Sequence, residues 1–365
     1  MKNRNEIYKR LSSVIHPEYK SDIVSLEIVK SYSEDENRIE ILLLFKRKND
    51  PMASSVRKLT ELAVKDIVKN RKEVVVSVVP DETPVNKEYN ALENVKHVVA
   101  IASGKGGVGK STVAVNLAVA LAKKGYKIGL LDADIYGPSL PIMFGLEGYR
   151  PDICQINRKD LMLPPEKFGV KVMSIGFFFD PSKALIWRGP MATSAIKNLL
   201  NDTCWGELDF LLIDLPPGTN DIHLTLVQTI GLSAAVVVTT PQMVAVADAI
   251  KAVNMFQDEK INIPVIGIVE NMAWFSPDDL PENKYYVFGK GGAQYISDKM
   301  NVPLIGNIPV SEKICSGGDS GNPAFMLDDP IIKIELDKIT GRFLEELEKS
   351  AAVHKPQKVE IKPQK

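Results

Sequence analysis

One glycine-rich segment has the residue types and the spacing of a phosphate-binding loop. It follows an apolar run and precedes a helical pattern that begins at Lys110. Glycines let backbone N–H groups converge on phosphate oxygens, a lysine reaches the terminal phosphates, and a hydroxyl can hold Mg²⁺. The segment fits the pattern G-x-x-x-x-G-K-[ST] and predicts a nucleoside triphosphate site. Its residues are Gly104, Lys105, Gly106, Gly107, Val108, Gly109, Lys110, Ser111 and Thr112.

The same glycines also fit a competing pattern, the G-x-G-x-x-G of a dinucleotide site. Two acidic residues, Asp132 and Asp134, follow near the expected offset of ~20 residues. A dinucleotide site has no use for a cation and a hydroxyl in the first turn of the helix, whereas a triphosphate with Mg²⁺ needs both. Lys110 and Ser111 therefore favour the triphosphate.

Carboxylates follow two of the apolar runs further along the chain. Asp132 and Asp134 follow one run, and Asp214 ends another that continues into Pro-Pro-Gly. An acidic residue at the carboxyl end of a strand beside a phosphate loop can orient an attacking water or hold Mg²⁺. The run that ends at Asp214 also matches the Walker B pattern, a hydrophobic strand that delivers an aspartate to the Mg²⁺ shell.

The composition is that of an ordinary globular protein. Hydrophobic residues make up 45% of the chain and charged residues 25%, and the net charge is -1. This charge gives no reason to expect nucleic acid or an anionic membrane as the main partner. No secretory signal and no long apolar span is visible, and three widely spaced cysteines cannot form a disulfide framework. A cytoplasmic location is expected.

Short apolar runs alternate with helical patterns in the larger part of the chain. Because these runs are apolar on both faces, they predict an α/β fold with a mostly parallel, doubly wound sheet of the P-loop NTPase kind. Ligands bind outside the carboxyl ends of such strands, where the motifs above fall. The strands are expected at 98–102, 127–131, 170–175, 210–215, 234–239, 265–269 and 304–306.

Residues 1–79 predict a small α/β domain of their own, and residues 80–94 predict a linker, because they are polar and hold two prolines. In the small domain, helices are expected at 7–15 and 54–70, and strands at 23–30, 38–45 and 73–79.

Residues 95–350 form the predicted P-loop ATPase domain, and residues 351–365 a disordered Lys/Pro tail. The last helical pattern, at 331–347, mixes both charge signs on its polar face, which favours packing on the sheet over membrane binding. The apolar residues that this helix would pack on the sheet are Ile331, Ile334, Ile339, Phe343 and Leu347.

Lys105 is unusual, because an ordinary phosphate loop needs one lysine. With it, the segment resembles the deviant Walker A motif of the MinD/ParA-like ATPases. In that group, the extra lysine reaches across a nucleotide-sandwich dimer to the partner's phosphates. The resemblance implies an ATP-dependent homodimer in which Lys105 acts in trans and Asp134 positions the attacking water. It also places Asp132 and Asp214 in the Mg²⁺ environment, beside Ser111.

Within that group, the chain is most similar to the Mrp/ApbC-type iron-sulfur cluster carrier family. The matching stretches are LDADIYGPS at 131–139, RGPM at 188–191, DLPPGTND at 214–221, TPQ at 240–242, ENM at 270–272 and GGDSG at 317–321. The N-terminal unit also resembles the iron-sulfur assembly domain often fused there, through HPE at 16–18 and DIVSL at 22–26. The resemblance implies that Asn271 contacts adenine. It further implies that ATP hydrolysis assists assembly or transfer of iron-sulfur clusters, with apoproteins or assembly factors as partners.

The chain departs from that family at the cluster site. Relatives carry C-x-x-C after the Asn-Met segment, one pair from each subunit, whereas Ser276 and Asp279 stand at those positions here. Clusters are held chiefly by thiolates, which oxygen ligands replace poorly. Cys315 is interpreted as a small apolar residue, with a single cluster ligand per subunit as the alternative. The four histidines show no metal-ligand spacing, so the iron-sulfur ligands remain unassigned.

Three other functions compete with this hypothesis. A MinD/ParA-like positioning ATPase would need a basic amphipathic C-terminal helix or a basic dimer face, and the sequence shows neither clearly. A cluster-free adaptor would keep the ATPase cycle and scaffold assembly factors through the N-terminal domain. A nicotinamide oxidoreductase is disfavoured by Lys110, Ser111 and Asp214.

Overall fold

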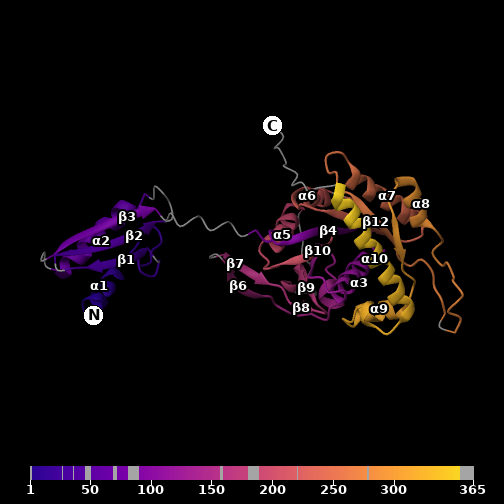
Figure 1. Ribbon diagram of the computed structural model, residues 1–365, viewed down its shortest axis with the longest axis horizontal. Helices are drawn as coiled ribbons and strands as arrows, with labels where there is room; N and C mark the ends of the chain where they lie inside the picture. Colours follow the sequence, from indigo (N-terminus) through magenta and orange to yellow (C-terminus); the bar gives the residue numbers. More distant parts are fainter. Residues whose placement is uncertain are drawn as a thin grey trace. The chain divides into compact units, whose positions relative to one another are not determined.

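The computed structural model describes residues 2–26, 28–35, 37–45, 51–68, 72–80, 90–156, 159–179, 189–219, 221–277 and 279–353. The chain forms two compact units, Met1–Tyr89 and Asn90–Lys365 (Figure 1). The boundary falls within the segment 80–94, of which residues 81–89 lie outside the described part. Each unit has its own central sheet.

In the N-terminal unit, α2 packs against a three-stranded sheet of order β1-β2-β3, and α1 packs against α2. Its elements are α1 (Lys2–Leu11), β1 (Val29–Glu34), β2 (Arg38–Phe45), α2 (Ala53–Val68) and β3 (Glu73–Pro80). Strand β1 runs antiparallel to β2, and β2 runs parallel to β3. Alternate residues of β2 are buried from Ile39 onward, which is the period of a strand with one face on a core. Val56 and Val64 of α2 join this core.

Two sequence predictions in this unit are wrong. The helix expected at 7–15 ends at Leu11, and the strand expected at 23–30 begins only at Val29. The Asp22 carboxylate accepts hydrogen bonds from two backbone N–H groups that follow it, at 3.0 and 2.8 Å. This local turn competes with strand formation, so the apolar residues after it reach the core from a turn.

The C-terminal unit is built on an eight-stranded sheet of order β13-β12-β11-β4-β10-β5-β9-β8. Neighbouring strands are parallel, except that β8 runs antiparallel to β9 at one edge. A separate antiparallel hairpin joins β6 (Asp152–Ile156) and β7 (Lys159–Leu163). The predicted α/β class, with its mostly parallel sheet and small N-terminal sheet, is confirmed. The strands of the large sheet are β4 (Val95–Ser103), β5 (Ile128–Asp132), β8 (Glu166–Lys167), β9 (Val170–Ser174), β10 (Leu208–Asp214), β11 (Ala234–Thr239), β12 (Val265–Glu270) and β13 (Leu304–Asn307).

Helices lie on both faces of the large sheet. The connections β4-α3-β5 and β10-α6-β11 run along the sheet in opposite directions, and right-handed crossovers then place their helices on opposite faces. Helix α3 packs against α10, and α7 packs against α8 (Figure 1). The helices are α3 (Lys110–Lys123), α4 (Leu140–Met143), α5 (Gly189–Asn201), α6 (Asp221–Thr229), α7 (Met243–Gln257), α8 (Gly292–Met300), α9 (Glu312–Asp319) and α10 (Pro330–Val353).

The last helix, α10, packs on the sheet beside β13. A Cβ at Gly306 of β13 would lie 2.3 Å from Ile339, so the glycine permits this close approach. Two residues expected on the buried stripe, Ile331 and Ile334, are instead 42% and 53% exposed. The helix extends to Val353, into the predicted tail, and residues 354–365 lie outside the described part. The buried stripe consists of Ile332, Leu336, Ile339, Phe343 and Leu347.

Among the helices that the structure describes, none combines the length and the apolar composition needed to cross a membrane.

Candidate nucleotide-binding site

The glycine-rich loop turns between the buried end of β4 and the first turn of α3. Gly107 and Gly109 have φ angles of +79° and +81°, in the left-handed region that favours glycine. At Gly104, a Cβ would lie 2.1 Å from the backbone carbonyl carbon of Asp248 in α7. Three positions of the loop therefore require glycine, two for backbone conformation and one for packing.

Strand register brings the carboxylates to the start of α3. Asp214, at the end of β10, is paired with Asp132, at the end of β5. The ammonium Nζ of Lys110 donates to Asp214 Oδ1 at 2.5 Å and lies 3.8 Å from Asp134 Oδ2. The Lys110 side chain is 6% exposed and that of Asp214 is 0% exposed. Solvent and salt therefore screen this ion pair very little.

Asp214 keeps an acceptor atom that is not used. Its Oδ2 is buried and has no hydrogen-bond partner among the residues that the structure describes. An unpaired buried carboxylate oxygen is costly, and such atoms commonly mark the place of a water or an ion. The hydroxyl of Ser111 lies 3.4 Å from Lys110 Nζ and so belongs to the same cluster.

Asp132 is held by three donors. Its Oδ1 accepts from the backbone N–H of Asp134 at 3.1 Å, and its Oδ2 accepts from the N–H of Leu140 at 3.3 Å and the hydroxyl of Ser174 at 3.0 Å. Burial, and then the nearby Asp214 carboxylate, raise the pKa of Asp132 to about 7. Burial also raises the pKa of Asp134. The cluster thus holds more carboxylates than a single lysine neutralises, which favours binding of a further cation.

Asn271 connects the segment after β12 to the phosphate loop. Its backbone N–H donates to the Thr239 carbonyl at 2.8 Å, and its side-chain Nδ2 donates to the Val108 carbonyl at 2.9 Å. The second contact depends on Gly109, because a Cβ there would lie 2.0 Å from Nδ2. The loop and Asn271 are therefore positioned as one unit.

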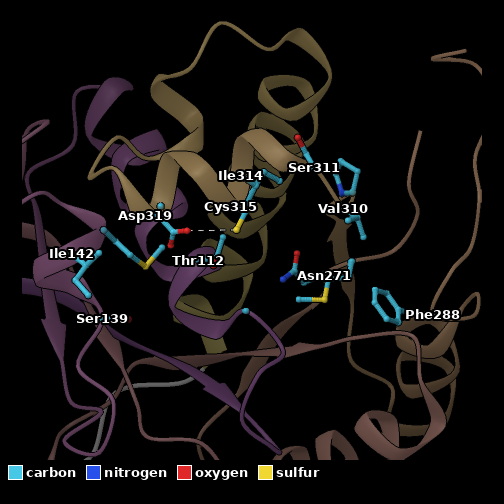
Figure 2. A pocket seen from close by; sticks show the side chains of 15 residues that line it. Thr112, Ser139, Ile142, Asn271, Phe288, Val310, Ser311, Ile314, Cys315 and Asp319 are labelled. Atoms are coloured by element: carbon cyan, nitrogen blue, oxygen red, sulfur yellow. Dashed lines mark hydrogen bonds between the residues drawn. The ribbon is translucent and has the colours of Figure 1, made fainter. Parts of the chain in front are cut away.

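Asn271 also borders a cavity of about 480 Å³ (Figure 2). Small-molecule sites commonly have volumes of this order. The cavity reaches the phosphate loop at Gly109, so it continues from the place where phosphates are expected. Its wall further includes Thr112, Phe288, Val310, Cys315 and Asp319.

Lys105 is exposed and is not part of the ion-pair cluster. Its carbonyl accepts a hydrogen bond from the Ser103 hydroxyl at 3.0 Å. Within the described part of the chain, its ammonium forms no ion pair. The fold thus gathers Lys110 and the carboxylates at one end of the sheet and leaves Lys105 directed to solvent.

Two polar residues that support the site were given no role from the sequence. Ser174 ends β9 and donates to Asp132, and the rule that strand carboxyl ends line the site could have identified it. Glu270 is 5% exposed, and its Oε2 accepts from the Ala293 N–H in the first turn of α8 at 2.7 Å. This bond ties the end of β12 to the start of α8. No sequence pattern distinguishes such a contact.

His223, in α6, is a buried histidine whose lowered pKa makes the stability of the fold depend on pH. Its side chain is fully buried, and burial lowers its pKa from 6.5 to about 4, although a bond to the Pro216 carbonyl opposes the shift. The unfolded chain therefore binds a proton between these pH values while the folded chain does not, so stability falls as pH decreases from about 6.5 to about 4.

We expect the His223→Gln variant to lose the part of the pH dependence of stability that His223 causes. From pH 7 to pH 5, the wild type should lose about 2 kcal/mol more unfolding free energy than the variant, since one pKa unit is about 1.4 kcal/mol. Urea unfolding of both proteins at the two pH values measures the difference. Parallel pH dependence in the two proteins would contradict the assignment.

Ser276 and Asp279, the residues that stand where cysteines were expected from the family resemblance, are both described by the structure. Ser276 is partly buried and Asp279 is exposed. Cys154 and Cys204 are partly buried, in β6 and after α5, and Cys315 is exposed in α9. Among the described residues, no three or more His, Cys, Asp and Glu side chains are grouped so that they could hold a metal ion.

Comparison with known proteins gives matches along most of the chain. Residues 94–343 match the ParA family model, described as NUBPL iron-transfer P-loop NTPase. An iron-sulfur cluster carrier protein of Synechocystis sp. is 42% identical over 317 residues, covering 86% of this chain and 88% of the relative. One of Aquifex aeolicus is 53% identical over 235 residues, covering 64% of this chain and 62% of the relative.

A solved structure is also similar. The nucleotide-binding protein of Archaeoglobus fulgidus, in complex with ADP, superposes with a TM-score of 0.57 and 38% sequence identity. The match covers 67% of this chain and 93% of that protein.

Proposed function

The chain belongs to the ParA family of NUBPL iron-transfer P-loop NTPases, and we propose that it is a cytoplasmic, homodimeric, Mg²⁺-dependent ATPase that assists iron-sulfur cluster assembly or transfer. The ADP complex of the Archaeoglobus fulgidus relative supports nucleotide binding. The names of the Synechocystis and Aquifex relatives support iron-sulfur clusters as the cargo and apoproteins or assembly factors as partners.

The buried ion pair between Lys110 and Asp214 is the observation that carries the ATPase proposal. A buried ammonium needs an anionic partner. Here the partner is the carboxylate of Asp214, at the end of β10, 2.5 Å from Lys110 Nζ. A terminal phosphate can take that place without leaving the ammonium unpaired. Lys110 would then stabilise the charge that develops on the transferred phosphoryl group.

The residues present also fit Mg²⁺. Ser111, Asp132 and Asp214 offer hydroxyl and carboxylate oxygens, which are the donors that Mg²⁺ prefers. The described residues contain no ready-made group of three metal ligands, but Mg²⁺ is ordinarily held by one or two carboxylates together with substrate phosphates. Bound in this way, the metal would supply positive charge to those phosphates.

Asp134 and Lys105 complete the proposed reaction. Asp134 lies 3.8 Å from Lys110 Nζ, and its raised pKa suits a carboxyl group that orients the attacking water. Lys105, exposed and without an ion-pair partner among the described residues, is available to reach the phosphates of a second subunit. Hydrolysis would then require the dimer.

The cargo can be tested by anaerobic reconstitution with iron and sulfide, read by the visible spectrum and by iron per dimer. A matched gain-of-function variant combines Ser276→Cys with Asp279→Cys, which restores the C-x-x-C spacing in a region where the side chains are accessible. If the chain carries a cluster itself, the wild type retains iron and sulfide after desalting. The Cys315→Ala variant shows whether that thiol is a ligand.

A second candidate function is favoured by the oxygen side chains at Ser276 and Asp279. These residues are poor cluster ligands, so the chain could use its ATPase cycle to bring assembly factors together without holding a cluster. The two functions give different results in the same experiment. Iron retained by the double variant but not by the wild type would reject the direct carrier and support the adaptor.

A further inference from the structure

Met272 has a backbone conformation that residues with a side chain disfavour. Its φ angle is +56°, in the left-handed region, where Cβ comes close to the following carbonyl oxygen. Glycine adopts this conformation without that cost. Met272 directly follows Asn271, after β12 has ended at Glu270. Non-glycine residues in such conformations cluster at ligand sites, where the surrounding structure holds them in place.

Backbone hydrogen bonds on both sides of Met272 impose this conformation. The N–H of Asn271 donates to the carbonyl of Thr239, the last residue of β11, at 2.8 Å. The N–H of Ala273 donates to the carbonyl of Ile308, directly after β13, at 2.9 Å. The chain must therefore turn at Met272 between two fixed points. The folded sheet itself maintains the turn.

The other non-glycine residues with a positive φ occupy ordinary places for it. Among the described residues they are Lys20, Phe168, Asn262 and Asn301, and none of these four lines the cavity beside the phosphate loop. Asn301 caps the C-terminus of α8, and Phe168 lies in the two-residue turn between β8 and β9. Met272 is thus set apart from them by its place on the cavity wall.

The cavity of about 480 Å³ has a phosphate-loop side and an apolar wall. Gly109 and Thr112, at the loop and in the first turn of α3, line it together with the apolar side chains of Met272, Phe288 and Val310 (Figure 2). A nucleotide whose phosphates occupy the loop leaves the apolar wall for its base. Apolar walls with few polar groups are typical of small-molecule sites.

We infer that Met272 is a specificity-determining residue of the proposed nucleotide site, and that its thioether packs on the flat face of the base. The inference rests on the proposed function, which places a nucleotide in this cavity. A methionine side chain is unbranched and polarisable, and its sulfur makes favourable contacts with aromatic rings. Glycine at this position would remove the backbone strain and would also remove the contact. The left-handed turn thus places an apolar side chain where the phosphate loop does not reach.

Two ligands, each with Mg²⁺, separate the base from the phosphates. One is the non-hydrolysable β,γ-imido analogue of ATP, and the other is inorganic tripolyphosphate, which has neither ribose nor base. Isothermal titration calorimetry on the full chain measures both affinities. We expect Met272→Gly to weaken the ATP analogue by at least about tenfold, because the apolar contact is lost, and to leave tripolyphosphate within about twofold of the wild type. Met272→Leu keeps the apolar volume and should stay within about threefold for both ligands.

Two further variants separate the side chain from the backbone. Met272→Ala loses the side chain but keeps Cβ, so it should bind the ATP analogue as weakly as Met272→Gly and unfold at a lower urea concentration. Lys20→Gly is the matched control, because Lys20 is exposed in the N-terminal unit and has a φ of +54°. This control should leave both affinities unchanged.

The ratio of the two affinities within each variant decides the outcome. An equal loss for both ligands in Met272→Gly would mean that the residue only shapes the loop, and an unchanged affinity for the ATP analogue would mean that the base lies elsewhere. Either result would overturn the inference and leave the nucleotide site in place. Failure of the wild type to bind the ATP analogue would instead overturn the proposed nucleotide site.

Discussion

Replacement of Lys110 by alanine is expected to reduce ATP turnover by about 10³-fold or more, because it removes the ammonium that we propose opposes charge on the transferred phosphate. The same change leaves the Asp214 carboxylate buried without its partner at 2.5 Å. Breaking a buried ion pair from one side typically costs about 3–5 kcal/mol of stability. A steady-state phosphate-release assay measures turnover, and urea unfolding measures stability.

A second substitution separates loss of activity from loss of folding. Adding Asp214→Asn to Lys110→Ala removes the stranded charge, so the double variant should regain stability and remain inactive. Lys123→Ala, an exposed lysine on the same helix, serves as the matched control and should behave as the wild type. Turnover by Lys110→Ala close to that of the control would refute the role proposed for this lysine.

Replacement of Lys105 by alanine should give a different phenotype. Because Lys105 is exposed and stands outside the buried cluster, its loss should leave folding intact and ATP affinity nearly unchanged. If it stabilises the phosphoryl charge in the partner's site, steady-state turnover should nevertheless fall by about 10²-fold or more. Equilibrium binding of a fluorescent ATP analogue and phosphate release measure the two effects independently.

Mixing the two inactive variants tests whether Lys105 acts in trans. In a mixed dimer, the Lys105→Ala subunit keeps Lys110 and receives Lys105 from its Lys110→Ala partner, which rebuilds one complete site. Random pairing of equal amounts should therefore restore about a quarter of wild-type turnover. If Lys105 served its own subunit, every mixed site would lack a lysine and no activity would return. Undiminished turnover by Lys105→Ala alone would remove the trans role altogether.

Local patterns in the sequence were sufficient for the strands that border the candidate site and for the glycine-rich loop. The β4, β5 and β10 runs are short, apolar and bounded, and the loop glycines follow from what a phosphate cradle requires. The ion pair between Lys110 and Asp214 could not be foreseen in this form, because it depends on the register between strands that are distant in sequence. The bond from Ser174 to Asp132 depends on register in the same way.

The errors have physical causes of two kinds. The strand expected at 23–30 failed because the Asp22 side chain stabilises a turn, a local competition that apolar patterning does not reveal. On α10, Ile339, Phe343 and Leu347 are buried as expected, whereas Ile331 and Ile334 are exposed, because only the packing partner decides which face of the helix is buried. The hairpin of β6 and β7 was not predicted at all.

The contact between Lys110 and Asp214 pairs the ammonium with an anion from within the chain. Under the proposed function, the Asp214 carboxylate competes with the nucleotide, so binding of ATP would exchange one anion for another at Lys110. The contribution of Lys110 to the affinity would then be the difference in free energy between its contact with phosphate and its ion pair with Asp214.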